Sequence, residues 1–185
     1  MTTTPASNNH IPGILTLQSK YLFVNLSADE RKKGFVTTPF TEAQIEEVIK
    51  DNGLFVALDD SLVVGYAFAG TWEYFTPWPI FPFMIDRLTG QQFGSVVISE
   101  SNTFQYGPVC IDEAYRGSGL FNQLFEEMRL SMRERFSVGL TFINQVNTHS
   151  YYAHTRKLGM QVIDSFSFNG NVYDALGFDT SKTVL

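Results

Sequence analysis

A glycine-rich loop in the second half of the chain has the residue types and spacing that bind a phosphate group. Its core, Arg116-Gly-Ser-Gly119, follows an apolar segment and precedes apolar residues that recur at helical spacing. A helix start presents unpaired backbone N–H groups and the positive end of the helix dipole, and both attract anions. Glycine has no Cβ, so the backbone of the loop can approach an anion closely. The segment therefore predicts a phosphate-binding loop at a helix N-terminus.

Strand-like and helical segments surround this loop and must position it. Apolar runs bounded by turn residues predict strands over 2–6, 54–58, 62–71, 103–111, 140–146, 162–168 and 172–178. Helices are expected from residue 10 or 11 to 25, over 117–136 and over 148–158, and capping boxes at Ser27 and Thr41 open two more. Asn169-Gly170 predicts a tight hairpin turn, and Gly107-Pro108 predicts a bulge. Three prolines within 72–83 predict that this aromatic stretch has no regular structure.

Composition limits the class of protein. The 185 residues, of which 44% are hydrophobic and 17% charged, fit one globular domain over residues 1–185. The net charge of −6 argues against a nucleic-acid partner, because a phosphate backbone requires a basic surface. The single cysteine, Cys110, cannot form an internal disulfide, so a reducing compartment is expected. No apolar run reaches the roughly 18 residues of a membrane span and the N-terminus lacks a signal-peptide core, so the expectation is a cytoplasmic protein without a membrane partner.

The order of these segments resembles the GCN5-related N-acetyltransferases (the GNAT family). The resemblance rests on the strand, the Arg116-Gly-Ser-Gly119 loop, the long helix, the next strand, the segment from Asn147 to Met160 and the final hairpin. The family's loop reads Gln/Arg-x-x-Gly-x-Gly/Ala, and this chain departs from it at Phe121, whose side chain fits if it turns into the core. The resemblance covers most of the chain except residues 72–102, and the segment from Ile14 to Phe35 looks like uncharacterised bacterial members.

The resemblance implies both a fold and an activity. The fold is of the α/β (α+β) class, with a central mixed, mostly antiparallel sheet of about seven strands, flanked by helices. The strands at 103–111 and 140–146 splay apart in its middle. The implied activity is transfer of an acetyl group from acetyl-CoA to a primary amine of a small molecule or a peptide, with acetyl-CoA as cosubstrate and no metal.

The same resemblance implies which residues hold acetyl-CoA. The main chain of Val109, Cys110 and Ile111 would hold pantetheine and the thioester carbonyl, as an added strand would. The pyrophosphate would be held by backbone N–H groups of Gly117, Ser118, Gly119, Leu120, Phe121 and Asn122. Arg116 either pairs with a phosphate or is an exposed loop charge, and Asn147 either bonds the pantetheine arm or caps its helix. Ser150 completes the implied cofactor site, and the Cys110 side chain is interpreted as a small core residue.

Catalytic roles are less well defined by the sequence. Deprotonating a lysine-like amine at pH 7 costs roughly 4–5 kcal/mol, so a base is useful. Glu73 is the candidate base because it should lie near the cleft, with a solvated carboxylate as the other interpretation; Tyr106 is the alternative, and Asp112 and Glu113 are expected to shape the loop. Family members place a tyrosine as general acid near the sulfur. Counting from Asn147 puts His154 in that position, whereas counting back from Gly159 puts Thr155 there, so the helix carries one extra residue. His154 is the preferred acid, and Tyr151 and Tyr152 are the alternatives.

The acceptor is not specified by the sequence. The aromatic stretch 72–83 fits the wall of an acceptor pocket, a homodimer interface or a hydrophobic lid packed on the sheet; its large rings are Trp72, Tyr74, Phe75, Trp78, Phe81 and Phe83. Two further functions stay open beside the enzyme. The first is a CoA sensor without turnover, and the second is a protein-interaction domain that has lost the ligand.

Overall fold

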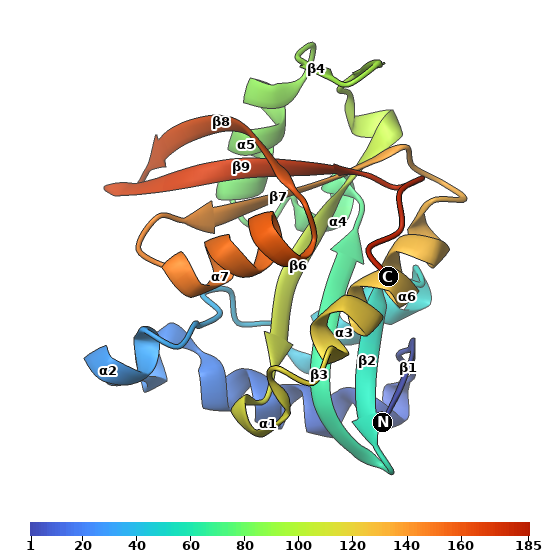
Figure 1. Cartoon of the computed structure of the whole chain (residues 1–185), viewed down its shortest axis with the longest axis vertical. Coiled ribbons are helices and arrows are strands. Elements are labelled where there is room, and N and C mark those ends of the chain that lie inside the picture. The colour runs from blue at the N-terminus through green and yellow to red at the C-terminus, as the bar shows by residue number, and fades with distance from the viewer.

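A seven-stranded sheet organises the molecule (Figure 1), and the computed structural model describes residues 1–185. The strand order is β1-β2-β3-β6-β7-β9-β8, and every neighbouring pair is antiparallel except β6–β7. The strands are β1 (Thr2–Pro5), β2 (Leu54–Asp59), β3 (Leu62–Gly70), β6 (Thr103–Ile111), β7 (Val138–Asn144), β8 (Gln161–Phe168) and β9 (Asn171–Asp179). This arrangement confirms the predicted mixed, mostly antiparallel sheet.

The two central strands part halfway along their length. β6 and β7 pair only from Thr103↔Val138 to Gln105↔Leu140, so the rest of β6 has no partner on that side. Opposite β3, the register passes from Ala69↔Tyr106 to Ala67↔Val109, so β6 carries one extra residue there. This is the bulge that Gly107-Pro108 predicted, and it lies where the two strands separate.

Helices cover both faces of the sheet (Figure 1). One face packs against α1 (Ile11–Tyr21), α3 (Glu42–Lys50), α4 (Trp72–Phe75) and α5 (Ile80–Leu88), and the other against α6 (Leu120–Met132). The remaining elements are α2 (Ala28–Arg31), α7 (Thr148–Tyr152), the hairpin β4 (Gln92–Phe93) and β5 (Val96–Val97), a π-helical turn (Ala153–Lys157), and 3-10 turns at Asn8–His10, Phe23–Asn25, Glu100–Asn102 and Glu113–Tyr115. Both capping boxes are present, at Ser27 and Thr41. The first helix ends at Tyr21 instead of residue 25 because the backbone becomes extended at Leu22.

The aromatic stretch 72–83 is helical, so the prediction of irregular structure was wrong. It forms α4 and the first turn of α5, and its prolines do not prevent this. Pro79 immediately precedes α5 and Pro82 lies in its first turn, where a backbone N–H has no intrahelical acceptor in any case. Trp72, Tyr74, Phe75 and Phe81 are buried in the core on that face, and the Trp72 indole donates to Thr103 Oγ1 at 3.0 Å. Packing on the sheet, one of the three roles, is therefore observed, and Phe81 also lines a pocket beside β6.

The segment after β7 contains the extra residue that the sequence count implied. Residues Ala153–Lys157 form a π-helical turn, which accommodates one residue more than an α-helical turn. Gly159 then ends the segment with a positive φ of 66°. The final hairpin turns at Asn169 and Gly170, both with positive φ, as the two-residue turn requires.

None of the helices combines the length and the apolar character that crossing a membrane would demand.

Candidate active site

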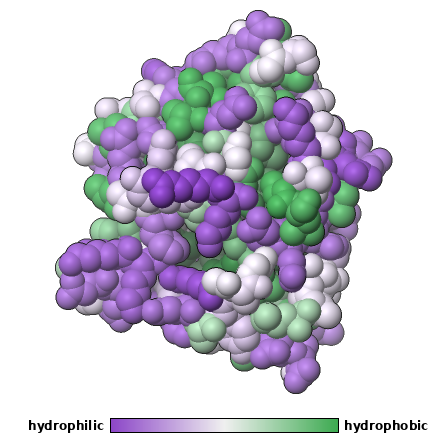
Figure 2. All heavy atoms as spheres, in the orientation of Figure 1, coloured by the Kyte–Doolittle hydropathy of each residue, from purple (hydrophilic) through white to green (hydrophobic).

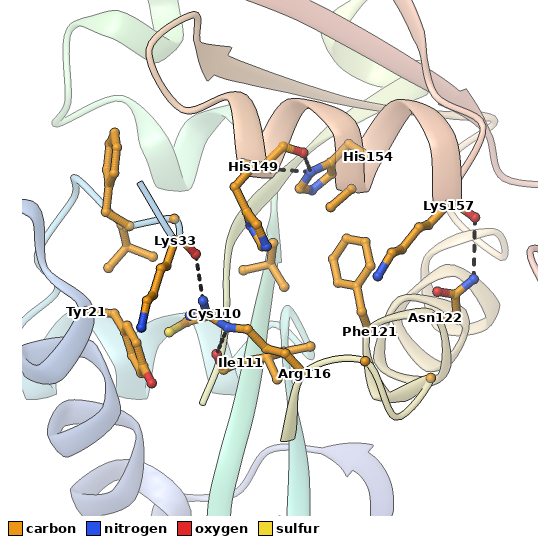
Figure 3. Close-up of a pocket in the computed structure, with 18 residues that line it drawn as sticks. Tyr21, Lys33, Cys110, Ile111, Arg116, Phe121, Asn122, His149, His154 and Lys157 are labelled. Atoms are coloured by element: carbon orange, nitrogen blue, oxygen red, sulfur yellow. Dashed lines mark hydrogen bonds between the residues drawn. The ribbon is translucent and has the colours of Figure 1, made fainter. Parts of the chain in front are cut away.

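A pocket of about 380 Å³ opens at the free edge of β6 (Figures 2 and 3). Its walls come from the second half of β6, the glycine loop with the start of α6, the segment from Lys33 to Val36, and α7 with the π-helical turn. Figure 2 shows this face hollowed between the α7 region above and the α1–α2 region below, with hydrophilic residues at the rim. The lining residues that the sequence also predicted are Val109, Cys110, Ile111, Arg116, Gly117, Gly119, Phe121, Asn122, Ser150 and His154.

The glycine loop presents a row of free backbone donors. Gly117 and Gly119 have φ of 80° and 86°, and Gly119 caps α6. A Cβ added at either glycine would meet nothing within 4 Å, so the space in front of the loop is open. The N–H groups of residues 117–121 have no acceptor in the chain, whereas that of Asn122 donates to the Gly119 carbonyl at 3.1 Å. The free donors that a phosphate cradle requires are therefore present over 117–121, whereas the Asn122 N–H already has an acceptor; phosphate binding by the loop stays a prediction.

The side chains of Ser118, Leu120 and Phe121 form contacts within the protein. Ser118 is exposed and its hydroxyl donates to the Tyr115 carbonyl at 2.7 Å. The side chain of Leu120, the first residue of α6, is buried in the core, so only its main chain is available to a ligand. Phe121 packs against the core on that side and lies edge-on to the His154 ring, with ring centres 5.2 Å apart. The Phe121 ring thus turns into the core, which is the orientation that allows a large side chain at this position of the loop. It still forms part of the pocket wall (Figure 3).

Positive charge dominates the pocket. Lys33, Arg116 and Lys157 line it, and no aspartate or glutamate does. Burial, and then the nearby charges of Arg116 and Lys157, lower the pKa of His149, which also lines the pocket. In a chain with a net charge of −6, this local excess of cations favours a polyanionic ligand.

Arg116 is a structural residue as well as a local charge. Its Nε donates to the Ile111 carbonyl at 2.9 Å and its guanidinium donates to the Lys33 carbonyl at 2.6 Å (Figure 3). The guanidinium also lies over the Tyr21 ring at 4.9 Å. The interpretation of Arg116 as an exposed loop charge was therefore wrong, because the side chain ties the loop to the segment before Phe35.

Asp112 and Glu113 shape the loop, as predicted. Asp112 pairs with Lys20 at 2.7 Å and accepts from the Ala114 N–H at 3.1 Å. Glu113 pairs with Lys33 at 2.6 Å, and its N–H donates to the Tyr21 hydroxyl at 2.7 Å. These contacts fasten the loop to the N-terminal segment on the opposite side of the pocket.

Lys157 lines the pocket, and its ammonium forms no ion pair within the chain. Its substitution therefore tests whether the positive charge of the pocket contributes to binding. We expect Lys157→Ala to weaken binding of coenzyme A about two- to fivefold, with a larger effect at low salt, since an exposed charge is screened as ionic strength rises. Calorimetric titration with coenzyme A at two salt concentrations measures the change. Lys50→Ala, which removes an exposed lysine outside the pocket, is the matched control, and an equal effect of both substitutions would contradict the assignment.

The free edge of β6 carries backbone groups that can pair with an extended ligand. The Asp112 N–H donates to the Val64 carbonyl at 2.9 Å, and Ile111 lies opposite Gly65. Because antiparallel pairs alternate, the N–H and C=O groups of Val109 and Ile111 face away from β3, toward the gap. Arg116 occupies the Ile111 carbonyl, so both groups of Val109 and the N–H of Ile111 stay available.

Cys110 lies between these two residues and its thiol is not a nucleophile. The side chain is buried in the core, and burial raises its pKa to about 12. The thiolate, which is the reactive form, is therefore scarce at neutral pH. This agrees with the interpretation of Cys110 as a small core residue.

His154 lies beside the pocket but cannot donate a proton near neutral pH. Its ring is 3% exposed, and burial lowers its pKa to about 4. Nδ1 lies 2.7 Å from the Ser150 carbonyl, which can only accept, so the proton of the neutral ring is on Nδ1 (Figure 3). With a pKa near 4, only about one ring in a thousand is protonated at pH 7. This burial, which the sequence did not reveal, argues against the predicted role of His154 as general acid.

The other catalytic candidates lie outside the pocket. Glu73 is exposed on α4 and lines no pocket near β6, and Tyr106 is fully buried with no hydrogen-bond partner for its hydroxyl. Burial raises the pKa of Tyr106, so it is not a base at neutral pH. Thr155 directs its hydroxyl to the Tyr151 carbonyl at 2.8 Å, and neither Tyr151 nor Tyr152 lines the pocket.

Asn147 and Ser150 hold the start of α7 in place. Asn147 caps this helix by accepting from the Ser150 N–H at 3.3 Å, and its amide donates to the Phe35 carbonyl, also at 3.3 Å. Of its two predicted roles, the helix cap is the one that the contacts show. Ser150 lines the pocket, and its hydroxyl lies 3.3 Å from His154 Nδ1.

A second, smaller pocket of about 90 Å³ adjoins the first across the gap between β6 and β7. Five residues line both: Phe35, Val36, Val109, Ser150 and His154. Sequence reasoning missed the contribution of residues 33–38, His149, Lys157 and Gln105 to these walls. Only Lys157, a cation in the last turn of its helix, carried a signal that could have drawn attention.

Known structures share this architecture, although no protein-family model and no curated protein sequence matches the chain. An N-acetyltransferase from Staphylococcus aureus Mu50 superposes with a TM-score of 0.64 at 16% identity, covering 97% of this chain and 98% of that one. A putative acetyltransferase from Salmonella typhimurium, solved with its cofactor acetyl-CoA, gives 0.63 at 16% identity over 98% and 95% of the two chains. A GNAT-family acetyltransferase from Streptococcus agalactiae gives 0.63 at 16% identity over 96% and 94%. The chain therefore has the GNAT fold.

Proposed function

We propose that this protein is an acetyl-CoA-dependent N-acetyltransferase that transfers the acetyl group to a primary amine. The observation that carries the proposal is the row of unpartnered N–H groups at residues 117–121, which opens into a cationic pocket at the parted edge of β6. A diphosphate on an extended arm matches both parts of this site. The GNAT fold and the neighbour solved with acetyl-CoA support the same ligand.

Each part of the site would contribute to binding. The N–H groups of the glycine loop would hold the pyrophosphate, and Lys33 and Lys157 would add long-range attraction. The free groups of Val109 and the N–H of Ile111 would pair with the pantetheine arm. One of these N–H groups would also stabilise the oxyanion that forms at the thioester carbonyl.

The reaction requires few ionisable groups from the protein. The amine nitrogen attacks the acetyl carbon, the carbon–sulfur bond breaks, and the sulfur leaves with the electron pair. The amine loses one proton in the process, and the thiolate gains one. Because no carboxylate lines either pocket and the buried His154 ring stays neutral, we infer that water, or His149 at the wall of the first pocket, carries these protons. Catalysis would then rest on positioning and on oxyanion stabilisation.

A titration followed by a turnover assay tests the proposal. Acetyl-CoA is expected to raise the melting temperature in a saturable manner, because a ligand that binds only the folded state stabilises it. Release of free CoA thiol should then depend on the added amine and saturate with it. Absence of any thermal shift or calorimetric signal at saturating acetyl-CoA would overturn the proposal.

A second candidate function is a CoA sensor without turnover. The neutral state of His154 and the lack of any carboxylate in the pockets favour it, since His149 is then the one remaining histidine that could transfer protons there. A sensor would bind acetyl-CoA with the same thermal shift and release no thiol with any amine. The turnover assay therefore separates the two functions.

A further inference from the structure

The second pocket has an uncharged lining. It is formed by residues of β6 and β7, by residues 35–38, by Asn147, Ser150 and His154 around α7, and by single residues of α5 and β9. None of them is an aspartate, glutamate, lysine or arginine. A second charged group brought into this pocket would lose its hydration without gaining an ionic partner, which is strongly unfavourable. The lining therefore selects against acceptors that carry a charge close to the reacting amine.

Aromatic rings form one part of the wall, and uncharged polar residues such as Thr37, Thr141 and Asn144 form much of the rest. Phe35, Phe81, Phe142 and Tyr173 all line the pocket, and Phe142 packs edge-on to both Phe81 and Tyr173, with ring centres 5.1 and 5.5 Å apart. Rings held by one another in this way form a rigid apolar surface. With a volume of about 90 Å³, the pocket fits a small hydrocarbon group.

One buried polar atom in this lining lacks a partner. Gln105 is 2% exposed, and its Nε2 donates to the Tyr106 carbonyl at 2.8 Å, which fixes the orientation of the amide. Its Oε1 is buried with no hydrogen-bond partner in the protein. An unpaired buried acceptor is costly, and an N–H of a bound amine would satisfy it.

We infer that the second pocket takes a primary monoamine with a small, uncharged apolar body, and that Gln105 Oε1 orients the amine nitrogen by accepting one of its N–H groups. The inference rests on the proposed function, because the first pocket must hold acetyl-CoA for the acceptor to meet it across the shared residues. Gln105 acts as a positioning residue here, since an amide neither takes nor gives a proton in the reaction.

A matched series of amines tests the acceptor class. n-Butylamine, putrescine and 4-aminobutanoate share a four-carbon chain and differ in the group at the far end, which is neutral, cationic or anionic. At saturating acetyl-CoA, and after correction for the fraction of free amine, we expect kcat/KM for n-butylamine to exceed that for either of the others at least tenfold. Equal or better use of putrescine or 4-aminobutanoate overturns the inference, as does the absence of turnover with all three when calorimetry shows that acetyl-CoA binds. Failure of acetyl-CoA to bind would instead overturn the proposed function.

Replacement of Gln105 tests its role separately. We expect Gln105→Met to lower kcat/KM for n-butylamine about tenfold while the dissociation constant of CoA stays unchanged. If Gln105 had a purely structural role, the substitution would change the dissociation constant of CoA as well as kcat/KM for the amine. Gln18→Met is the matched control, because Gln18 is also a buried glutamine but bonds only the Phe40 backbone, remote from both pockets. Unchanged kcat/KM in Gln105→Met, or an equal loss in Gln18→Met, would remove Gln105 from the site.

Discussion

Gly119→Glu is expected to abolish binding of acetyl-CoA, with a loss of affinity of at least a hundredfold. Gly119 caps α6, and a side chain there would extend into the open space before the N–H groups of residues 117–121. A carboxylate on that side chain would compete for the same donors and repel the diphosphate. Calorimetric titration of the purified variant with acetyl-CoA measures the loss.

Backbone strain needs a control, because a residue other than glycine is disfavoured at positive φ. Gly90 has a φ of 87° against 86° for Gly119, and a Cβ there also meets nothing within 4 Å. Gly90 follows α5 and lines neither pocket, so Gly90→Glu adds the same charge and the same strain away from the loop. This variant should bind acetyl-CoA as the wild type does. Wild-type affinity in Gly119→Glu would refute the phosphate site.

Local sequence patterns were sufficient to predict the frame of the site. The strand 103–111 was predicted at its observed bounds, and the loop glycines, whose positive φ only glycine adopts easily, marked the start of α6. The resemblance added the splay of β6 and β7 and the extra residue after Asn147, which the structure accommodates as a π-helical turn. These features depend on residues that are close in the sequence or on an order of elements that the family shares.

The errors concern properties that depend on distant parts of the chain. The prolines of 72–83 were interpreted as helix breakers, but Pro82 falls in the first turn of a helix that packs on the sheet. The pKa of His154 follows from its burial between Tyr106 and Phe121, which come from other elements. Likewise, residues 33–38 are held at the wall of both pockets by contacts with distant residues, among them the bonds from Arg116 and Asn147 to the carbonyls of Lys33 and Phe35. No local pattern reports such contacts.

The buried His154 ring should make the protein less stable in acid. Its folded-state pKa is about 4, below the ordinary histidine value of 6.5, so the unfolded chain binds an additional proton between these two values. The free energy of unfolding is therefore highest above pH 6.5 and falls as the pH decreases toward 4. From pH 7.5 to pH 4.5, this single group accounts for a loss of about 2–3 kcal/mol.

Substitution of His154 isolates this contribution from that of the carboxylates. Urea unfolding at pH 7.5 and pH 4.5 should show a decrease in the free energy of unfolding that is about 2–3 kcal/mol smaller in His154→Gln than in the wild type, whatever the substitution costs at pH 7.5. If His154→Gln and the wild type lost the same free energy between the two pH values, the His154 ring would titrate normally in the folded protein. A ring with an ordinary pKa would again be available as the general acid, and proton transfer without His154 would no longer follow.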